Sequence, residues 1–147
     1  MMNRRWLCLP VLLILALALA ARGYSGARRL EASRLLSRAE TVSLGMVARG
    51  QAPRQLLAQN LRDLRLAAEL DPLEVGIPLA LGSQYLLLGR PEKAAESYRE
   101  ALALEPRPEI YLNLGKALRL SGQEQEANQC FDRAIRLDRN MRQQVPR

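Results

Sequence analysis

Residues 75–107 and 108–141 of this 147-residue chain are two copies of one pattern. Leu81-Gly82 recurs 33 residues later as Leu114-Gly115, and Gly89 recurs as Gly122. The other matched pairs are Tyr85 and Leu118, Ala94 and Ala127, Tyr98 and Phe131, and Ala101 and Ala134. A period of this length indicates a supersecondary unit that buries its apolar face by stacking on copies of itself.

The spacing inside each copy predicts two antiparallel helices. In the first copy, the second helix carries small and aromatic residues at the three-and-four spacing of one helical face, namely Ala94, Tyr98, Ala101 and Leu102. Gly89 is expected in the left-handed conformation that ends the first helix, and Pro91 is expected to open the second. In the second copy the helices are predicted at residues 108–120 and 124–137.

Small residues are expected to let the two helices of each pair approach closely. Gly82 and Ala94 come from facing helices, and neither carries a side chain that would hold the axes apart. We therefore predict that these two residues meet across the hairpin.

Residues 76–106 resemble a tetratricopeptide repeat (TPR). Its signature positions are occupied by Leu81, Gly82, Tyr85, Gly89, Ala94, Tyr98, Ala101, Leu102 and Pro106. Pro78 stands where the family has an early aromatic residue, and Arg139 replaces the closing proline of the second copy. The resemblance implies an all-α fold in which antiparallel helix hairpins stack as a short right-handed superhelix, an α-solenoid.

The domain organisation follows from the repeats. Upstream of them only a second helix fits the pattern, and Asn60 takes the place of its small residue, so residues 27–72 are expected to form a divergent hairpin. The predicted order is a leader at 1–25, the divergent hairpin at 27–72, repeats at 75–107 and 108–141, and a tail at 142–147.

The leader contains an uncharged, apolar run at residues 6–21 behind a short basic head. Its sixteen residues lie between the core of a cleavable signal peptide and a spanning helix, and the Ala18-Leu19-Ala20 triplet would suit a signal peptidase. The sequence therefore predicts an N-terminal apolar helix that is either a signal peptide or a single-pass membrane anchor.

Charges on both sides of this run bear on its orientation. The head supplies Arg4 and Arg5, whereas Arg22, Arg28, Arg29 and Arg34 follow the run and oppose export. The basic head and the small residues at the end of the run favour export, so a periplasmic or otherwise extracytoplasmic body is the preferred prediction. A body on the cytoplasmic face stays open.

Several kinds of chemistry lack the residues they need. The chain has no His, which removes the usual general base and the commonest metal ligand. Cys8 lies in the leader, so Cys130 has no partner and is interpreted as a small buried hydrophobic residue. No catalytic, cofactor-binding or metal-binding residue is predicted, and the chain is not expected to be an enzyme.

The net charge of +7 raises the alternative of nucleic-acid binding. Apart from Lys93 and Lys116 the basic residues are all Arg, and they are scattered over several predicted helices without a dense tract or interleaved aromatics. A solvated basic surface is therefore favoured over a nucleic-acid interface.

The resemblance to TPR proteins implies a concave surface lined mainly by the first helix of each pair. By register the partner-binding residues would be Leu79, Ser83, Leu86, Leu112, Asn113, Lys116 and Arg119. Asn113 and Lys116 share one helical face and suit a peptide carboxylate or backbone. The family's full carboxylate clamp is absent, because Leu79, Ala80 and Ser83 stand where the preceding repeat should contribute.

Only ten residues follow Leu137, too few for the polar helix that usually caps a stack of repeats. Ile135 and Leu137 are therefore expected to form a hydrophobic end surface that supports self-association into a homo-oligomer or docking on a partner.

Together these observations predict a non-enzymatic adaptor or scaffold that binds a protein or peptide partner. It would be tethered to the membrane through residues 6–21 or exported across it, and would serve an envelope assembly or secretion complex. The first alternative is a membrane-anchored recruiter of soluble factors that faces the cytoplasm. The second is a basic, helical nucleic-acid-binding protein.

Overall fold

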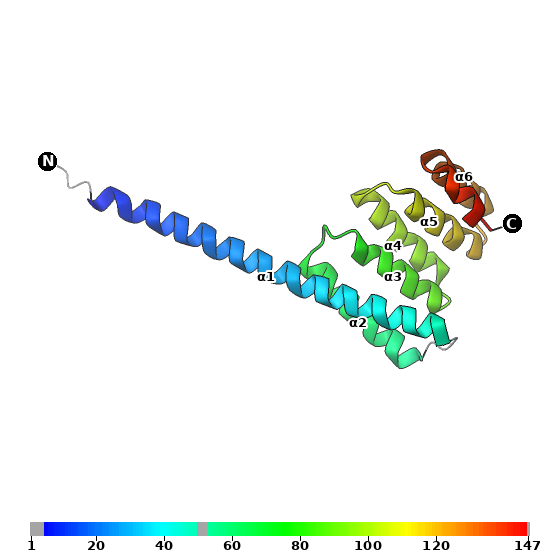
Figure 1. Cartoon of the computed structure of the whole chain (residues 1–147), viewed down its shortest axis with the longest axis horizontal. Helices are drawn as coiled ribbons and strands as arrows, with labels where there is room; N and C mark the ends of the chain where they lie inside the picture. Colours follow the sequence, from blue (N-terminus) through cyan, green and yellow to red (C-terminus); the bar gives the residue numbers. More distant parts are fainter. Residues whose placement is uncertain (1–4, 50–52, 147) are drawn as a thin grey trace.

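The computed structural model describes residues 5–49 and 53–146, and the regular secondary structure in this part of the chain is all helical. The elements are α1 (Arg5–Arg49), α2 (Arg54–Leu70), α3 (Gly76–Leu87), α4 (Pro91–Leu104), α5 (Pro108–Leu120), α6 (Glu124–Leu137) and the 3-10 helix η1 (Arg139–Gln144). Helices α5 and α6 begin and end at the predicted residues. The expected all-α architecture is confirmed (Figure 1).

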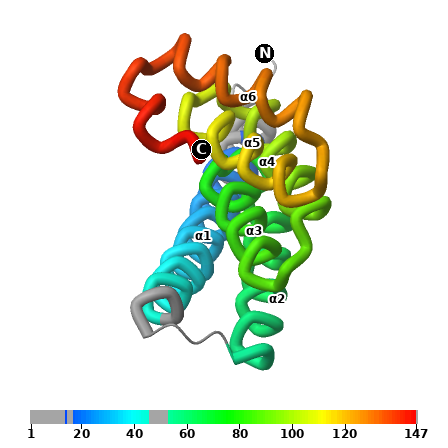
Figure 2. Tube along the Cα trace, turned by 90° about the vertical axis from the view of Figure 1, so that its right-hand side faces the viewer, coloured from blue at the N-terminus to red at the C-terminus, as the bar shows by residue number. Residues whose placement is uncertain are grey.

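The helices pair in chain order into three antiparallel hairpins: α1 with α2, α3 with α4, and α5 with α6. Each second helix also contacts the first helix of the next hairpin, so that α2 packs on α3 and α4 packs on α5. Figure 2 shows the resulting stack, in which α1, α3 and α5 follow one another. One apolar cluster runs through the whole stack from Ala32 to Ala134. Each hairpin therefore buries its apolar face against its neighbours.

Two glycines end the first helices of the repeats as predicted. Gly89 has φ of 65° and Gly122 has φ of 80°, a left-handed conformation that side chains with a Cβ rarely adopt. Past Gly89, the backbone N–H of Arg90 donates to the carbonyl of Tyr85 at 2.9 Å, which satisfies a carbonyl left over at the helix end. The chain can thereby reverse direction within two residues.

The close approach within each hairpin includes an aromatic ring in addition to the predicted meeting of Gly82 and Ala94, which stays a prediction. A Cβ on Gly82 would lie 2.7 Å from both Cδ1 and Cζ of Tyr98, and a Cβ on Gly115 would lie 2.5 Å from Cε1 of Phe131. Each glycine therefore makes room for an aromatic ring of the partner helix. The small residue is needed because this ring lies against it.

Helix α1 is continuous from Arg5 to Arg49, and so it crosses the expected boundary between leader and hairpin. Its second half packs on α2 and α3 through Ala32 and Ala39, each 1% exposed. Asn60, which takes the place of the small residue on α2, donates from Nδ2 to the carbonyl of Ala39 at 3.3 Å. Gln84 of α3 donates to Ser43 in the same region. Buried amides thus replace part of the usual close packing here.

The first half of α1 extends beyond the other helices (Figure 1). Where side chains are described it exposes large apolar groups, among them Leu17 at 62%, Leu19 at 70% and Tyr24 at 68%. Most of the predicted membrane segment at residues 6–21 lies outside the described side chains. Within the described residues, no helix combines the length and apolar character needed to cross a bilayer.

The sequence suggested that the C-terminal end of the stack is bare. In the structure this end is partly covered. η1 folds back onto both α5 and α6, and Asp138 caps it by accepting a hydrogen bond from the backbone N–H of Asn140 at 2.9 Å. Met141 and Val145 pack against the core cluster. Leu137 remains 50% exposed and Ile135 is partly buried, so only part of the predicted hydrophobic end surface is open.

Candidate functional site

The residues predicted to bind a partner come from α3 and α5, the first helices of the two repeats. On α3, Leu79 and Leu86 are partly buried and Ser83 is exposed. The hydroxyl of Ser83 lies 3.2 Å from the carbonyl of Leu79 and 3.3 Å from the hydroxyl of Tyr98. Burial raises the pKa of Tyr98, and the hydrogen bond with Ser83 opposes this rise. The α3 surface is therefore apolar, with a neutral polar centre.

On α5 the predicted residues divide into two groups. Asn113 and Lys116 are partly exposed one turn apart, and among the described residues no side-chain hydrogen bond or ion pair engages either of them. Leu112, in contrast, is 2% exposed and belongs to the core cluster. It offers no surface to a partner in this structure, which corrects its assignment to the binding surface.

Arg119 also departs from its predicted role, because the fold itself uses its guanidinium. Nη1 donates to the carbonyl of Pro146 at 2.7 Å, and Nε lies 3.5 Å from a carboxylate oxygen of Glu124. The guanidinium also sits 4.6 Å from the centre of the Phe131 ring. Arg119 therefore joins α5, α6 and the C-terminal tail, and this role explains its position at the edge of the stack.

The structure thus reduces the predicted binding surface to five residues, which we call the α3–α5 face: Leu79, Ser83, Leu86, Asn113 and Lys116. Lys116 is its cation, and Asn113 supplies an amide that can both donate and accept hydrogen bonds. This pair on α5 can bind a backbone or a single carboxylate. It has no second cation to complete a clamp of the type seen in the family.

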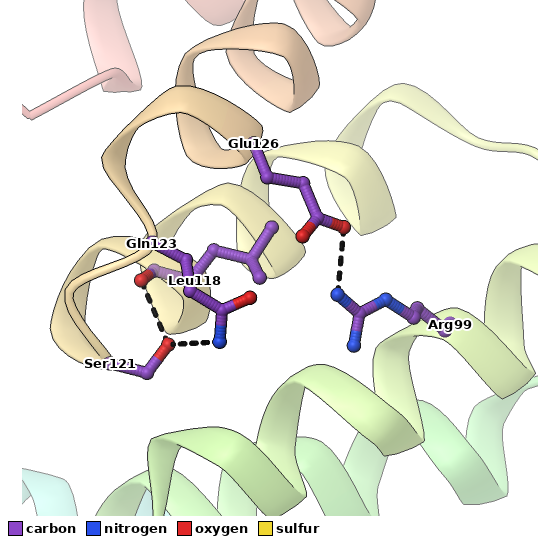
Figure 3. A network of polar contacts seen from close by, with 5 residues as sticks. All are labelled: Arg99, Leu118, Ser121, Gln123 and Glu126. Carbon is purple, nitrogen blue, oxygen red and sulfur yellow. Dashed lines mark hydrogen bonds and ion pairs between the residues drawn. The ribbon is translucent and has the colours of Figure 1, made fainter.

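One exposed ion pair links the second helices of the two repeats. Arg99 of α4 donates from Nη2 to Glu126 of α6 at 2.7 Å (Figure 3). At the turn before α6, the hydroxyl of Ser121 donates to the carbonyl of Leu118 at 2.9 Å and lies 3.3 Å from Nε2 of Gln123 (Figure 3). The Arg99–Glu126 pair therefore joins two successive hairpins, whereas the Ser121 contacts lie within the turn of the second repeat.

Cys130 is buried on α6, as predicted for a small apolar residue. Burial raises the pKa of its thiol, nearby Glu126 raises it further, and Arg99 partly offsets both effects. Such a thiol is protonated near neutral pH and is a poor nucleophile. Among the described residues, no group of three His, Cys, Asp or Glu side chains is arranged to hold a metal ion.

Sequence reasoning missed the contribution of α1. A shallow, open surface lies along this helix. It is lined by Ser33, Arg34, Ser37, Arg38, Thr41 and Val42. Because α1 lacks the repeat signature, no register was available to place these residues on a surface. The only signal in the sequence was the polar and basic face they form together.

Comparisons with known proteins agree with the repeat pattern. A family model described as TPR repeat matches residues 82–122, and one described as tetratricopeptide repeat matches residues 108–141. No match was found among curated proteins.

Three solved structures illustrate the likeness in fold. The second TPR of Spaghetti (RPAP3), bound to an HSP90 peptide, is 17% identical with a TM-score of 0.65, over 78% of this chain and 97% of that one. The thermophilic TPR protein TTC0263 of Thermus thermophilus is 26% identical with a TM-score of 0.59, over 88% of this chain and 66% of that one.

MamA protein is 24% identical with a TM-score of 0.58, over 72% of this chain and 56% of that one. The chain therefore spans little more than half of MamA, and the likeness to MamA concerns the fold. The matched family models, the left-handed glycines and the stacked hairpins lead to one conclusion: residues 82–141 are tetratricopeptide repeats, and the chain folds as a TPR-like helical solenoid.

Proposed function

We propose that this protein is a non-enzymatic adaptor that binds a protein or peptide segment on the α3–α5 face. The observation that carries the proposal is the division of the predicted residues into two groups. Leu112 and Arg119 are used by the fold, whereas Asn113 and Lys116 are partly exposed on α5 and are not engaged within the described chain. A face built on rigid helices can accept an extended segment without having to order itself first.

The expected partner segment carries a carboxylate. Lys116 provides a positive charge, Asn113 can bind the backbone, and the chain as a whole has a net charge of +7. The solved TPR domain of Spaghetti is bound to a peptide, SRMEEVD, that contains acidic residues. A single lysine predicts weaker and less specific carboxylate binding than a multi-residue clamp gives.

Site-specific photo-crosslinking in native membranes tests this proposal. A photoreactive amino acid at Ser83 on the α3–α5 face should capture a partner, whereas the same group at the exposed Glu96 of α4 should not. Lys116→Glu should abolish the Ser83 adduct. Lys93→Glu is the matched control, because it makes the same charge change on α4. An adduct that survives Lys116→Glu, or that forms equally at Glu96, would argue against the α3–α5 face.

We also propose that residues 6–21 attach the body to a membrane or direct its export. The sequence pattern supports this, as do the exposed Leu17, Leu19 and Tyr24 on the projecting part of α1. The arginines that follow, including Arg22 and Arg28, would suit anionic lipid headgroups. In such a place the adaptor would raise the local concentration of its partner near an envelope assembly or secretion complex.

Extraction of membranes with alkaline carbonate tests this second part. The full chain should stay in the pellet, and a chain that starts at Gly26 should be released. Protease added to spheroplasts should digest an extracytoplasmic body. Shielding of the body until lysis would instead favour the cytoplasm-facing recruiter.

Self-association through the exposed part of the C-terminal end is a third element of the proposal. Leu137, the last residue of α6, is half exposed. Light scattering of the wild type and of Leu137→Glu should show a loss of the larger species in the variant. A wild type that is monomeric at high concentration would exclude this contact.

A further inference from the structure

A cavity on the edge of the first repeat lies apart from the α3–α5 face. It has a volume of about 380 Å³ and lies between the α2–α3 connection, the start of α3 and the end of α4. This volume lies at the small end of the range for ligand pockets, so it suits one side chain of a bound segment. Its lining is Ala68, Asp71, Pro72, Glu74, Ile77, Pro78, Leu81, Glu100, Ala103 and Leu104.

The register of the two repeats explains why the cavity exists. Pro78 of α3 corresponds to Tyr111 of α5, 33 residues later, and Tyr111 packs against the core cluster. Ile77, Leu81 and Leu104 have the same residue types at their matching positions in the second repeat. The walls are therefore alike, but the first repeat places a compact proline where the second places an aromatic ring. A space suited to a ring is left open beside Pro78.

The rim of the cavity is acidic in an otherwise basic protein. Glu74 and Glu100 line it, and their counterparts in the second repeat are Arg107 and Arg133. Among the described residues no ion pair engages Glu74 or Glu100. Asp71, the third carboxylate, has the guanidinium of Arg29 at 3.8 Å. Arg107 lies near Glu74 but is hydrogen-bonded to Glu105.

We propose that this cavity binds an aromatic side chain of a partner segment whose neighbouring residues are Arg or Lys. Burying a ring against Ile77, Pro78 and Leu81 removes apolar surface of both molecules from water. The flanking cations would then face Glu74 and Glu100, which gives the site its selectivity. The segment differs in chemistry from the carboxylate-bearing one expected on the α3–α5 face, so the two surfaces can bind different parts of a partner.

Two short peptides test the proposal by NMR on the full chain, with the same detergent concentration in every sample. The probe is acetyl-Arg-Trp-Arg-amide, and its charge-reversed control is acetyl-Glu-Trp-Glu-amide. The basic peptide should shift the amide signals of Ile77, Leu81 and Leu104 in a saturable way. Its affinity should exceed that of the acidic peptide by about tenfold, as expected for two charge contacts at a surface.

Three variants assign the binding to the cavity. Glu100→Lys should weaken the basic peptide by about three- to tenfold. Glu96→Lys, on the same helix but outside the lining, should leave the affinity unchanged. Pro78→Trp should fill the cavity and abolish the shifts, and its circular dichroism spectrum reports whether it folds. The proposal is overturned by the absence of saturable shifts at Ile77 and Leu81, by equal binding of both peptides, or by a Glu100→Lys variant that binds as the wild type does.

Discussion

Replacing Gly82 with alanine tests the contact between a glycine and a ring on which each repeat depends. The new Cβ would lie 2.7 Å from two carbons of the Tyr98 ring, well inside van der Waals contact. Tyr98 is 1% exposed, so its ring is enclosed by the core and cannot swing out into solvent. Overpacking of this kind costs about 1–3 kcal/mol of unfolding free energy. The better helix propensity of alanine returns about 1 kcal/mol.

Gly45→Ala in α1 is the matched control. A Cβ at Gly45 would have no other group within 4 Å, so this variant should gain about 0.5–1 kcal/mol from propensity alone. The difference between the two variants isolates the cost of the ring contact, which should be about 1–3 kcal/mol. Gly115→Ala, against Phe131, should behave like Gly82→Ala because its geometry is the same.

Urea unfolding of the full chain, followed by far-UV circular dichroism, measures these differences. A double-mutant cycle adds a stricter criterion: in a Tyr98→Leu background, the cost of Gly82→Ala should fall by about 1 kcal/mol or more. If Gly82→Ala stabilises the protein as much as Gly45→Ala does, the ring contact does not restrict this position and our account of the hairpin is wrong.

Three further predictions concern the turns, the tail and the thiol. Gly122→Ala should destabilise the protein by about 1–2 kcal/mol in the same urea experiment, because φ of 80° is left-handed. Arg119→Ala should release the C-terminal tail, which would appear as faster amide hydrogen exchange in residues 139–146, whereas unchanged exchange would mean that the bond to Pro146 is dispensable. In a Cys8→Ser background, iodoacetamide should label Cys130 more slowly in folded than in urea-unfolded protein, because the folded pKa is raised. The raised pKa also links the ionisation of Cys130 to the stability of the protein. The stabilising contribution is fully present below the pKa that the thiol has in the unfolded chain, and it decreases as the pH rises through the pKa of the thiol in the folded chain. Urea unfolding midpoints measured across this pH range should show the decrease.

How much of the candidate site could be predicted depends on how far apart in the sequence the residues that form it lie. Placing Leu79, Ser83, Asn113 and Lys116 on the first helices needed only the repeat register. The burial of Leu112 could not be predicted, because it requires the folded arrangement around α5. The cavity beside Pro78 left a trace in the sequence, a missing aromatic, but its depth depends on α2 and α4 together.

The sequence by itself determined the helical hairpins of the repeats, because their signals are local. Gly89 and Gly122 set the turns, and the spacing of apolar residues sets the buried face of each helix. Only the tertiary structure decided which exposed positions stay open. Arg119 is bound by Pro146, and the second half of α1 packs on two helices, α2 and α3. Such outcomes depend on segments far apart in the chain, whose approach no local pattern of residues specifies.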